Sequence, residues 1–137
     1  MMLIDTTVWI VWLRDRDTQT TRHLDMLLDE GEALLTPVVL QEILQGAKSA
    51  QALDTLQKRF QPLPMLSPTP ETYAKAGALY AHCRWQGITP RSPHDCLIAQ
   101  IAVENQVPLL HDDRDFLFIA QIEPALILWP ESRRRHE

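Results

Sequence analysis

Short apolar runs alternate along the chain with longer segments in which apolar residues recur at helical spacing. The runs are almost free of polar residues, which is typical of strands buried on both faces of a parallel sheet. We expect strands at residues 2–4, 33–35, 107–110 and 125–128. We expect helices at residues 8–13, 18–30, 36–46, 49–60, 69–86, 92–105 and 113–120.

The ends of several helices are marked by capping residues. Thr36 followed by Pro37 is typical of a helix start, and Gly31 and Gly87 lie where helices should stop. Thr6 or Thr7 can cap the first helix. Prolines restrict residues 61–67, so any strand there should be short and at the sheet edge.

Strands that alternate with helices predict a three-layer α/β/α fold around a short, mostly parallel sheet. The chain has 137 residues, which fits one domain. We expect that domain at residues 1–130, followed by a polar tail at residues 131–137.

Composition narrows the class of protein. The net charge of -5 argues against a protein that grips nucleic acid by overall positive charge. No run approaches the roughly 20 apolar residues of a membrane span, and the N-terminal run lacks the basic flank of a signal peptide. We therefore expect a cytoplasmic protein without membrane contact, in which Cys83 and Cys96 are reduced thiols.

Four acidic residues lie beside residues that belong in a core. Asp5 ends the first apolar run, Glu42 interrupts a helical apolar stripe, Asp95 opens an apolar helix, and Asp113 follows the run ending at Leu110. A buried carboxylate costs several kcal/mol unless something compensates its charge. One divalent cation with oxygen ligands would compensate all four.

The predicted topology brings these acids together. Asp5 and Asp113 follow strands whose carboxyl ends should lie at one edge of a parallel sheet, where ligands bind in such folds. Glu42 and Asp95 lie near the starts of their helices. Two carboxylates about 4 Å apart repel by roughly 4 kcal/mol at an effective dielectric of about 20. Carboxylates without His or Cys favour Mg²⁺ or Mn²⁺ over zinc.

Each acid also has a simpler interpretation. Asp95 can form a capping box with Ser92, and Asp113 can cap the helix that follows it. Asp5 can be a turn acid, and Glu42 can face solvent. Four separate explanations are then required, whereas the metal site needs one.

Nearby basic residues are weaker candidates for substrate contacts. Arg84 or Arg91 can hold a substrate phosphate, and His94 or His111 can contact a phosphate or a water, although a structural role is open for both histidines. The arginines at residues 133–135 can attract RNA or form a solvated tail.

Four segments in order resemble the motifs of PIN domains, most closely the VapC-type toxins of bacterial toxin–antitoxin pairs. They are residues 3–9, residues 38–43, Arg84 and Gly87 followed by residues 94–99, and residues 110–116. Each motif is weak alone, but all four in this order are specific, and they cover nearly the whole chain.

The resemblance implies a Mg²⁺- or Mn²⁺-dependent endoribonuclease whose acidic positions fall on Asp5, Glu42, Asp95 and Asp113. Of these, Asp5, Asp95 and Asp113 are expected to bind the metal. Thr6 and Asp115 are accessory candidates, and the substrate-binding candidates are Arg84, Arg91 and His111. The resemblance also implies an RNA substrate, a homodimer and a cognate antitoxin that blocks the site.

The chain departs from the family pattern around the fourth acid. His111 stands where Thr or Ser is common, and Asp112 lies beside Asp113. Asp113 is preferred because Phe116 then follows three residues later, although Asp112 and Asp115 remain alternatives.

Two other classes of function are open. A phosphatase-type phosphotransfer enzyme would want a second acid two residues after Asp5, where this chain has Thr7. A non-catalytic PIN-like module that binds RNA or protein would be expected to lack one or more of the acids.

Overall fold

The computed structural model describes residues 1–130, so the predicted polar tail lies outside the described residues. Its centre is a sheet with strand order β2-β1-β3-β4, in which all neighbours are parallel. The strands are β1 (Met2–Ile4), β2 (Ala33–Leu34), β3 (Leu109–Leu110) and β4 (Leu128–Trp129). The predicted parallel sheet is confirmed, although three strands are shorter or shifted. The segment at residues 61–67 contributes only an isolated bridge between Leu35 and Met65.

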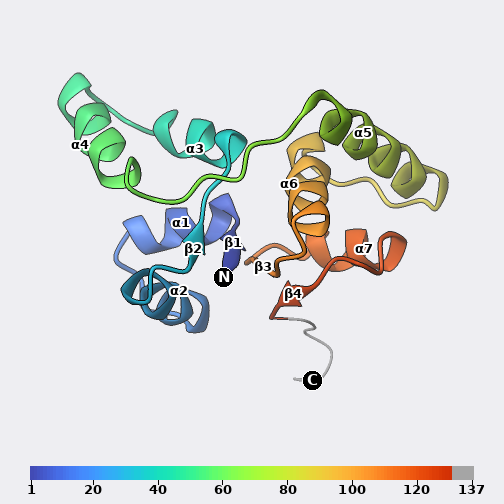
Figure 1. Cartoon of the computed structure of the whole chain (residues 1–137), viewed down its shortest axis with the longest axis horizontal. Coiled ribbons are helices and arrows are strands. Elements are labelled where there is room, and N and C mark those ends of the chain that lie inside the picture. Colours follow the sequence, from blue (N-terminus) through green and yellow to red (C-terminus); the bar gives the residue numbers. More distant parts are fainter. Residues whose placement is uncertain (131–137) are drawn as a thin grey trace.

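Helices cover both faces of this sheet, as the three-layer prediction requires. Figure 1 shows α1 and α2 on one side, and α6 and α7 on the other. This division follows from right-handed crossovers that lead in opposite directions from the central strands β1 and β3. The helices are α1 (Thr6–Leu13), α2 (Gln19–Asp29), α3 (Pro37–Leu44), α4 (Ala50–Phe60), α5 (Pro70–Trp85), α6 (Pro93–Glu104) and α7 (Asp115–Ile122).

The helix ends agree only partly with the sequence predictions. Pro37 opens α3 after Thr36, but the Thr36 hydroxyl donates to the Leu66 carbonyl at 2.8 Å instead of capping the helix. The residue that caps α1 is Asp5, which corrects the expected cap at Thr6 or Thr7. A carboxylate accepts from a free helix amide better than a hydroxyl with another partner.

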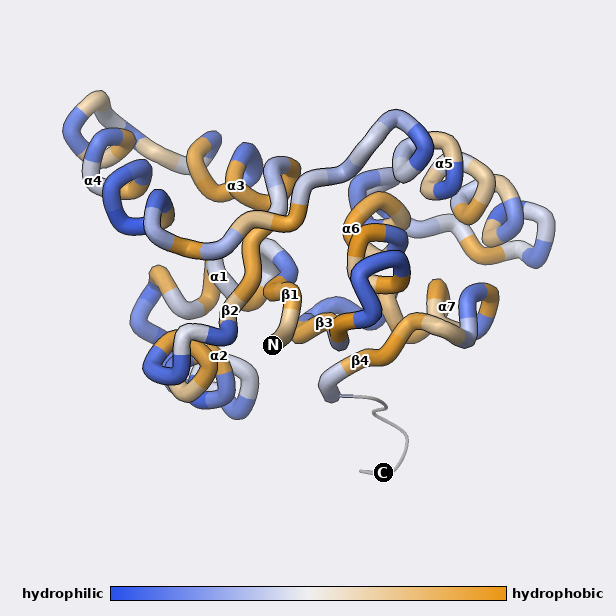
Figure 2. Tube along the Cα trace, viewed as in Figure 1, coloured by the Kyte–Doolittle hydropathy of each residue, from blue (hydrophilic) through white to orange (hydrophobic). Residues whose placement is uncertain are grey.

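The core lies where the apolar runs predicted it. The strands and α6 are mainly apolar in Figure 2, whereas α2 and α4 alternate between apolar and polar residues. Residues 96–102 of α6 are all buried. The helix is therefore enclosed on most sides, which holds its N-terminal turn in a fixed position relative to the sheet.

Both cysteines are free and buried, as expected. Burial, and then the neighbouring Cys83, raises the pKa of Cys96 to about 12. Across residues 1–130, no helix has the length and apolar character needed to cross a membrane.

Candidate active site

The acids converge because the ends of two adjacent strands meet there. The Asp5 amide, directly after β1, donates to the Leu110 carbonyl at the end of β3 at 2.9 Å. The loop that follows β3 carries Asp113, and α7 begins at Asp115. The first turn of α6 supplies Asp95, and α3 supplies Glu42.

Asp5 is the most deeply buried of these acids. Its side chain is 2% exposed. The Thr7 hydroxyl donates to Asp5 Oδ2 at 2.5 Å and the Thr7 amide at 3.1 Å. Burial raises the pKa of Asp5 to about 6, with a smaller contribution from the Glu42 charge, while the Thr7 hydrogen bonds oppose the shift.

Asp95 is the electrostatic centre of the group. Burial is the largest cause that raises its pKa to about 8. The remaining causes are the charges of four other carboxylates: Asp5, Asp113, Asp115 and Glu42. The four acids that the sequence singled out are therefore close enough to interact electrostatically, and Asp115, an accessory candidate, interacts with them.

Three of these carboxylates are arranged as ligands for one cation. Asp95, Asp113 and Asp115 each offer an oxygen, and these oxygens lie within 4.8 Å of one another. Hard oxygen donors suit Mg²⁺ or Mn²⁺. Burial, together with the charges of neighbouring carboxylates, raises the pKa values of Asp5 and Asp95, and a bound divalent cation would favour their ionised forms. The residues present fit such an ion.

The geometry separates the three adjacent candidates after β3. The Asp112 carboxylate accepts from the Thr20 hydroxyl at 3.0 Å and lies outside the cluster. Asp113 and Asp115 both lie inside it. Asp113 also accepts from the Asp115 amide at 3.0 Å, although the N-cap residue of α7 is Arg114 and not Asp113.

Asp95 does not complete the capping box that its spacing suggested. The Ser92 hydroxyl accepts from the His94 amide at 3.2 Å and caps α6 by itself. The pKa of Asp95 responds instead to the other acids. Ser92 thus caps the helix, and Asp95 belongs to the acidic cluster.

Glu42 is held from two sides at the edge of the cluster. The Thr6 hydroxyl donates to Glu42 Oε1 at 2.5 Å, and His94 Nδ1 lies 3.2 Å from Glu42 Oε2. Thr6 is buried, and the Glu42 side chain is only partly exposed. Thr6, which the sequence marked as an accessory candidate, therefore contacts Glu42.

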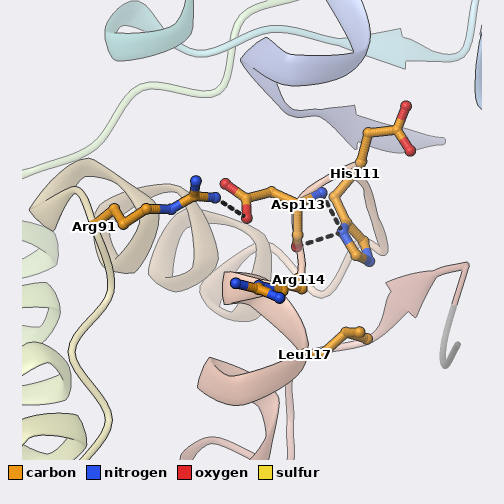
Figure 3. A pocket seen from close by; sticks show the side chains of 6 residues that line it. Arg91, His111, Asp113, Arg114 and Leu117 are labelled. Atoms are coloured by element: carbon orange, nitrogen blue, oxygen red, sulfur yellow. Dashed lines mark hydrogen bonds and ion pairs between the residues drawn. The ribbon is translucent and has the colours of Figure 1, made fainter. Parts of the chain in front are cut away.

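In the described part of the chain, Arg91 is the arginine that forms ion pairs with the clustered acids. Its Nη2 donates to Asp113 Oδ1 at 2.7 Å, and its Nε donates to Asp115 Oδ2 at 3.1 Å. Figure 3 shows the guanidinium pointing toward the Asp113 carboxylate. A hollow of about 450 Å³ adjoins this contact, and Arg91, His111, Asp113, Arg114 and Leu117 contribute to its lining.

His111 lies beneath this hollow and is 2% exposed. Its Nε2 lies 3.1 Å from the Pro130 carbonyl oxygen. Its Nδ1 lies 3.0 Å from the Asp113 carbonyl oxygen and 3.2 Å from the Asp113 amide nitrogen. These contacts favour a role in holding the loop around Asp113, and a direct contact with substrate stays a prediction.

Arg84, a predicted substrate contact, lies in a part of the fold away from the acids. It lies in the last turn of α5, and that end of the helix points away from the sheet in Figure 1. The spacing between Arg84 and Gly87 instead marks a helix end, where Gly87 adopts a φ of 79°.

Two polar residues of the site have contacts that the sequence did not predict, since Thr7 was considered only as a helix cap and His94 only as a contact for a phosphate or a water. Thr7 bonds Asp5, and its hydroxyl also accepts from the Asp112 amide at 3.2 Å. His94 contacts Glu42. An Asp followed two residues later by Thr is a pattern for a local side-chain turn, and it could have identified Thr7.

Comparison with known proteins agrees with this arrangement. The PIN domain family matches residues 2–121. VapC ribonuclease Mb1587 of Mycobacterium bovis and ribonuclease VapC11 of Mycobacterium tuberculosis are each 34% identical over 126 residues, which cover 89% of this chain and 93% of theirs.

Solved structures share the fold at lower sequence identity. DNA-bound VapBC from Salmonella typhimurium superimposes with a TM-score of 0.72 at 21% identity, covering 93% of this chain and 97% of the other. VapBC-1 from nontypeable Haemophilus influenzae gives a TM-score of 0.71 at 19% identity, covering 93% and 95%. With a family match over residues 2–121 and relatives 34% identical, the chain belongs to the PIN domain family and is of the VapC type.

Proposed function

We propose that this protein is a metal-dependent endoribonuclease that acts as the toxin of a toxin–antitoxin pair. The observation that supports this most directly is the gathering of four other carboxylates around Asp95, in a chain 34% identical to VapC ribonucleases. Stability alone does not explain why these acids are gathered, because carboxylates that are buried or partly buried without compensation oppose folding.

Asp5, Asp95 and Asp113 would hold Mg²⁺ or Mn²⁺, with Asp115 as a further ligand. The bound ion would supply a water whose pKa is lowered toward neutrality. The protein's own contribution is to fix the carboxylates in place: Thr7 restrains Asp5, and the start of α7 restrains Asp113 and Asp115. These contacts limit the reorganisation that the carboxylates would need when they bind an ion.

Glu42 would orient or deprotonate the attacking water. Thr6 already bonds one of its oxygens, and His94 lies near the other. In hydrolysis the water oxygen bonds to phosphorus, one P–O ester bond breaks, and the departing oxygen gains a proton. A carboxylate with fixed orientation can accept the proton that the water releases.

RNA would approach the acids despite the net charge of -5. A divalent cation reverses the sign of the local charge at the cluster. Arg91 and Arg114 line the adjoining hollow and could contact phosphates beside the scissile bond.

The first test is cleavage of labelled single-stranded RNA with Mg²⁺ or Mn²⁺. We expect EDTA to abolish cleavage and Asp5→Asn to lower its rate by about 100-fold or more, since metal-bound water and its ligands act together. Asp54→Asn is the control, because the exposed Asp54 carboxylate pairs with Lys58 on α4 and lies outside the acidic cluster, so activity should be retained. Cleavage that survives both EDTA and Asp5→Asn would rule out the metal-acid mechanism.

The toxin role is tested by growth. Expression of the chain alone should arrest a bacterial host, and Asp95→Asn should relieve the arrest because it removes the carboxylate at the centre of the cluster. Protein levels must be matched by immunoblot, with Asp54→Asn again as the control. Equal growth inhibition by wild type and Asp95→Asn would contradict the role assigned to Asp95.

The proposed partners are a cognate antitoxin and a second copy of the chain. The solved neighbours from Salmonella typhimurium and Haemophilus influenzae are VapBC complexes, which supports an antitoxin partner here. Co-expression with the neighbouring small reading frame should restore growth and yield a co-purifying complex. Size-exclusion chromatography with light scattering measures whether the chain alone is a dimer.

A further inference from the structure

We propose that Arg91 exchanges partners: it binds Asp113 and Asp115 in the metal-free protein, and it moves to an RNA phosphate once a divalent cation occupies the acids. This inference rests on the proposed function. It adds an order of binding, in which the metal ion binds first and the RNA second. Arg91 would then be a substrate-positioning residue that also compensates the empty cluster.

The contacts of Arg91 divide into a fixed part and a movable part. Its backbone amide donates to Asp115 Oδ2 at 3.1 Å, which anchors the main chain just before α6. Its guanidinium contacts Asp115 through Nε and Asp113 through Nη2. The side chain is 73% exposed, so it can leave the carboxylates while the backbone contact remains.

A divalent cation would compete with the guanidinium for these carboxylates. Asp113 and Asp115, the two acceptors of Arg91, are also two of the three acids whose oxygens lie within 4.8 Å of one another. Asp113 Oδ1 already accepts from Arg91 and from the Asp115 amide. Since like charges repel, a bound cation would weaken the ion pair that now holds Arg91.

The released guanidinium could occupy one of two hollows that Arg91 already lines. Arg91 and Arg114 both line the hollow of about 450 Å³ beside Asp113, and both line a second hollow of about 320 Å³. Figure 3 shows the two side chains on neighbouring parts of the first hollow. A guanidinium binds phosphate through two parallel hydrogen bonds, so an RNA backbone is a suitable new partner.

The chain supplies a matched control in Arg114. It has the same charge, lines the same two hollows and follows Asp113 directly. Within the described part of the chain, however, Arg91 is the arginine that pairs with Asp113 and Asp115. Arg114→Gln therefore removes a nearby positive charge without removing the exchange.

Calorimetric titration of the full chain with Mn²⁺, without RNA, tests the first half. Arg91→Gln should bind Mn²⁺ about two- to fivefold more tightly, the range expected when one exposed ion pair no longer competes. Arg114→Gln should change the affinity less. Weaker or unchanged Mn²⁺ binding by Arg91→Gln, or an equal gain in Arg114→Gln, would overturn the proposal. Far-UV circular dichroism verifies that both variants are folded.

Binding of a fluorescent single-stranded RNA at several salt concentrations tests the second half. Ca²⁺ serves as the ion, with a gel to verify that the RNA stays intact. In Ca²⁺, Arg91→Gln should lower the slope of log affinity against log salt by about 0.7, the loss of one phosphate contact. In EDTA the slope should match wild type, because Arg91 is then held by the acids.

The outcomes separate this inference from the proposed function. An equal loss of slope in Ca²⁺ and EDTA would overturn the exchange while RNA cleavage by wild type still stood. Wild-type protein that neither binds nor cuts RNA would overturn the proposed function and the RNA half of this inference together. Tighter Mn²⁺ binding by Arg91→Gln would still establish competition at the acids in that case.

Discussion

At the scale of single residues, the site depends on side chains that hold the acids as much as on the acids themselves. The acids were identifiable because each interrupts an apolar run, and a charge beside core residues needs an explanation. Thr7 bonds Asp5 only two residues away, a local contact that the sequence pattern allows, but its contact with the Asp112 amide joins positions more than a hundred residues apart and could not be read from the sequence. A hydroxyl is also uncharged, so a threonine beside apolar residues does not indicate a functional site in the sequence.

Thr7 should therefore act as a positioning residue. Thr7→Val removes the hydroxyl that donates to Asp5 while preserving the shape of the side chain. We expect metal affinity or cleavage rate to fall by about 10- to 100-fold, the usual effect of losing a contact that orients a ligand. Titration with Mn²⁺ and the RNA cleavage assay measure this. Thr7→Ser keeps the hydroxyl and should stay near wild type, so an equal defect in both variants would contradict the hydrogen-bond argument.

At the scale of elements, the sequence predicted which helices and strands exist better than where they end. Hydrophobic periodicity identified all seven helices and four strands described in residues 1–130. The strands came out shorter because pairing in the sheet, rather than apolar character, decides how many residues are in register. Residues 61–67 likewise met the sheet only at Met65.

Two glycines, one inside α5 and one just past its end, should respond in opposite ways to replacement by alanine. Gly87 has a φ of 79°, which a side chain rarely adopts, so Gly87→Ala should destabilise the protein by about 1–2 kcal/mol. Gly77 lies inside α5, and an added Cβ there meets nothing within 4 Å. Gly77→Ala should stabilise by about 0.5–1 kcal/mol. Urea unfolding measures both, and a shift in the same direction for the two variants would refute this account.

At the scale of the whole molecule, one edge of the sheet collects negative charge that the fold does not fully compensate. The pKa values of Asp5 and Asp95 are raised to about 6 and about 8, chiefly by burial. The folded protein thus retains protons that the unfolded chain has already released at the same pH. The stability linked to these protons is present near pH 4 and is lost as the pH rises through about 6 and then about 8.

Asp95→Asn should separate this effect from the other titrating groups. In EDTA, the Tm of Asp95→Asn should gain a few degrees on that of wild type between pH 5 and pH 9, because about 1 kcal/mol shifts the Tm of a domain of this size by about 4 °C. Thermal unfolding at several pH values measures the difference. A difference that does not change with pH would show that Asp95 does not titrate in this range.

Mn²⁺ should reverse the same pH dependence. The ion binds ionised carboxylates, so it should raise the Tm of wild type more at pH 8 than at pH 6. Asp95→Asn should respond less at both pH values.

The sequence by itself determined the parallel α/β architecture and the candidate acids, because hydrophobic period and charge within apolar runs are properties of neighbouring residues. Only the tertiary structure decided which carboxylates share the cluster. It included Asp115, directed Asp112 toward Thr20, left Arg84 at a distant helix end and paired Arg91 with the acids. These choices depend on distances between side chains from different elements, and strand pairing and helix packing set those distances.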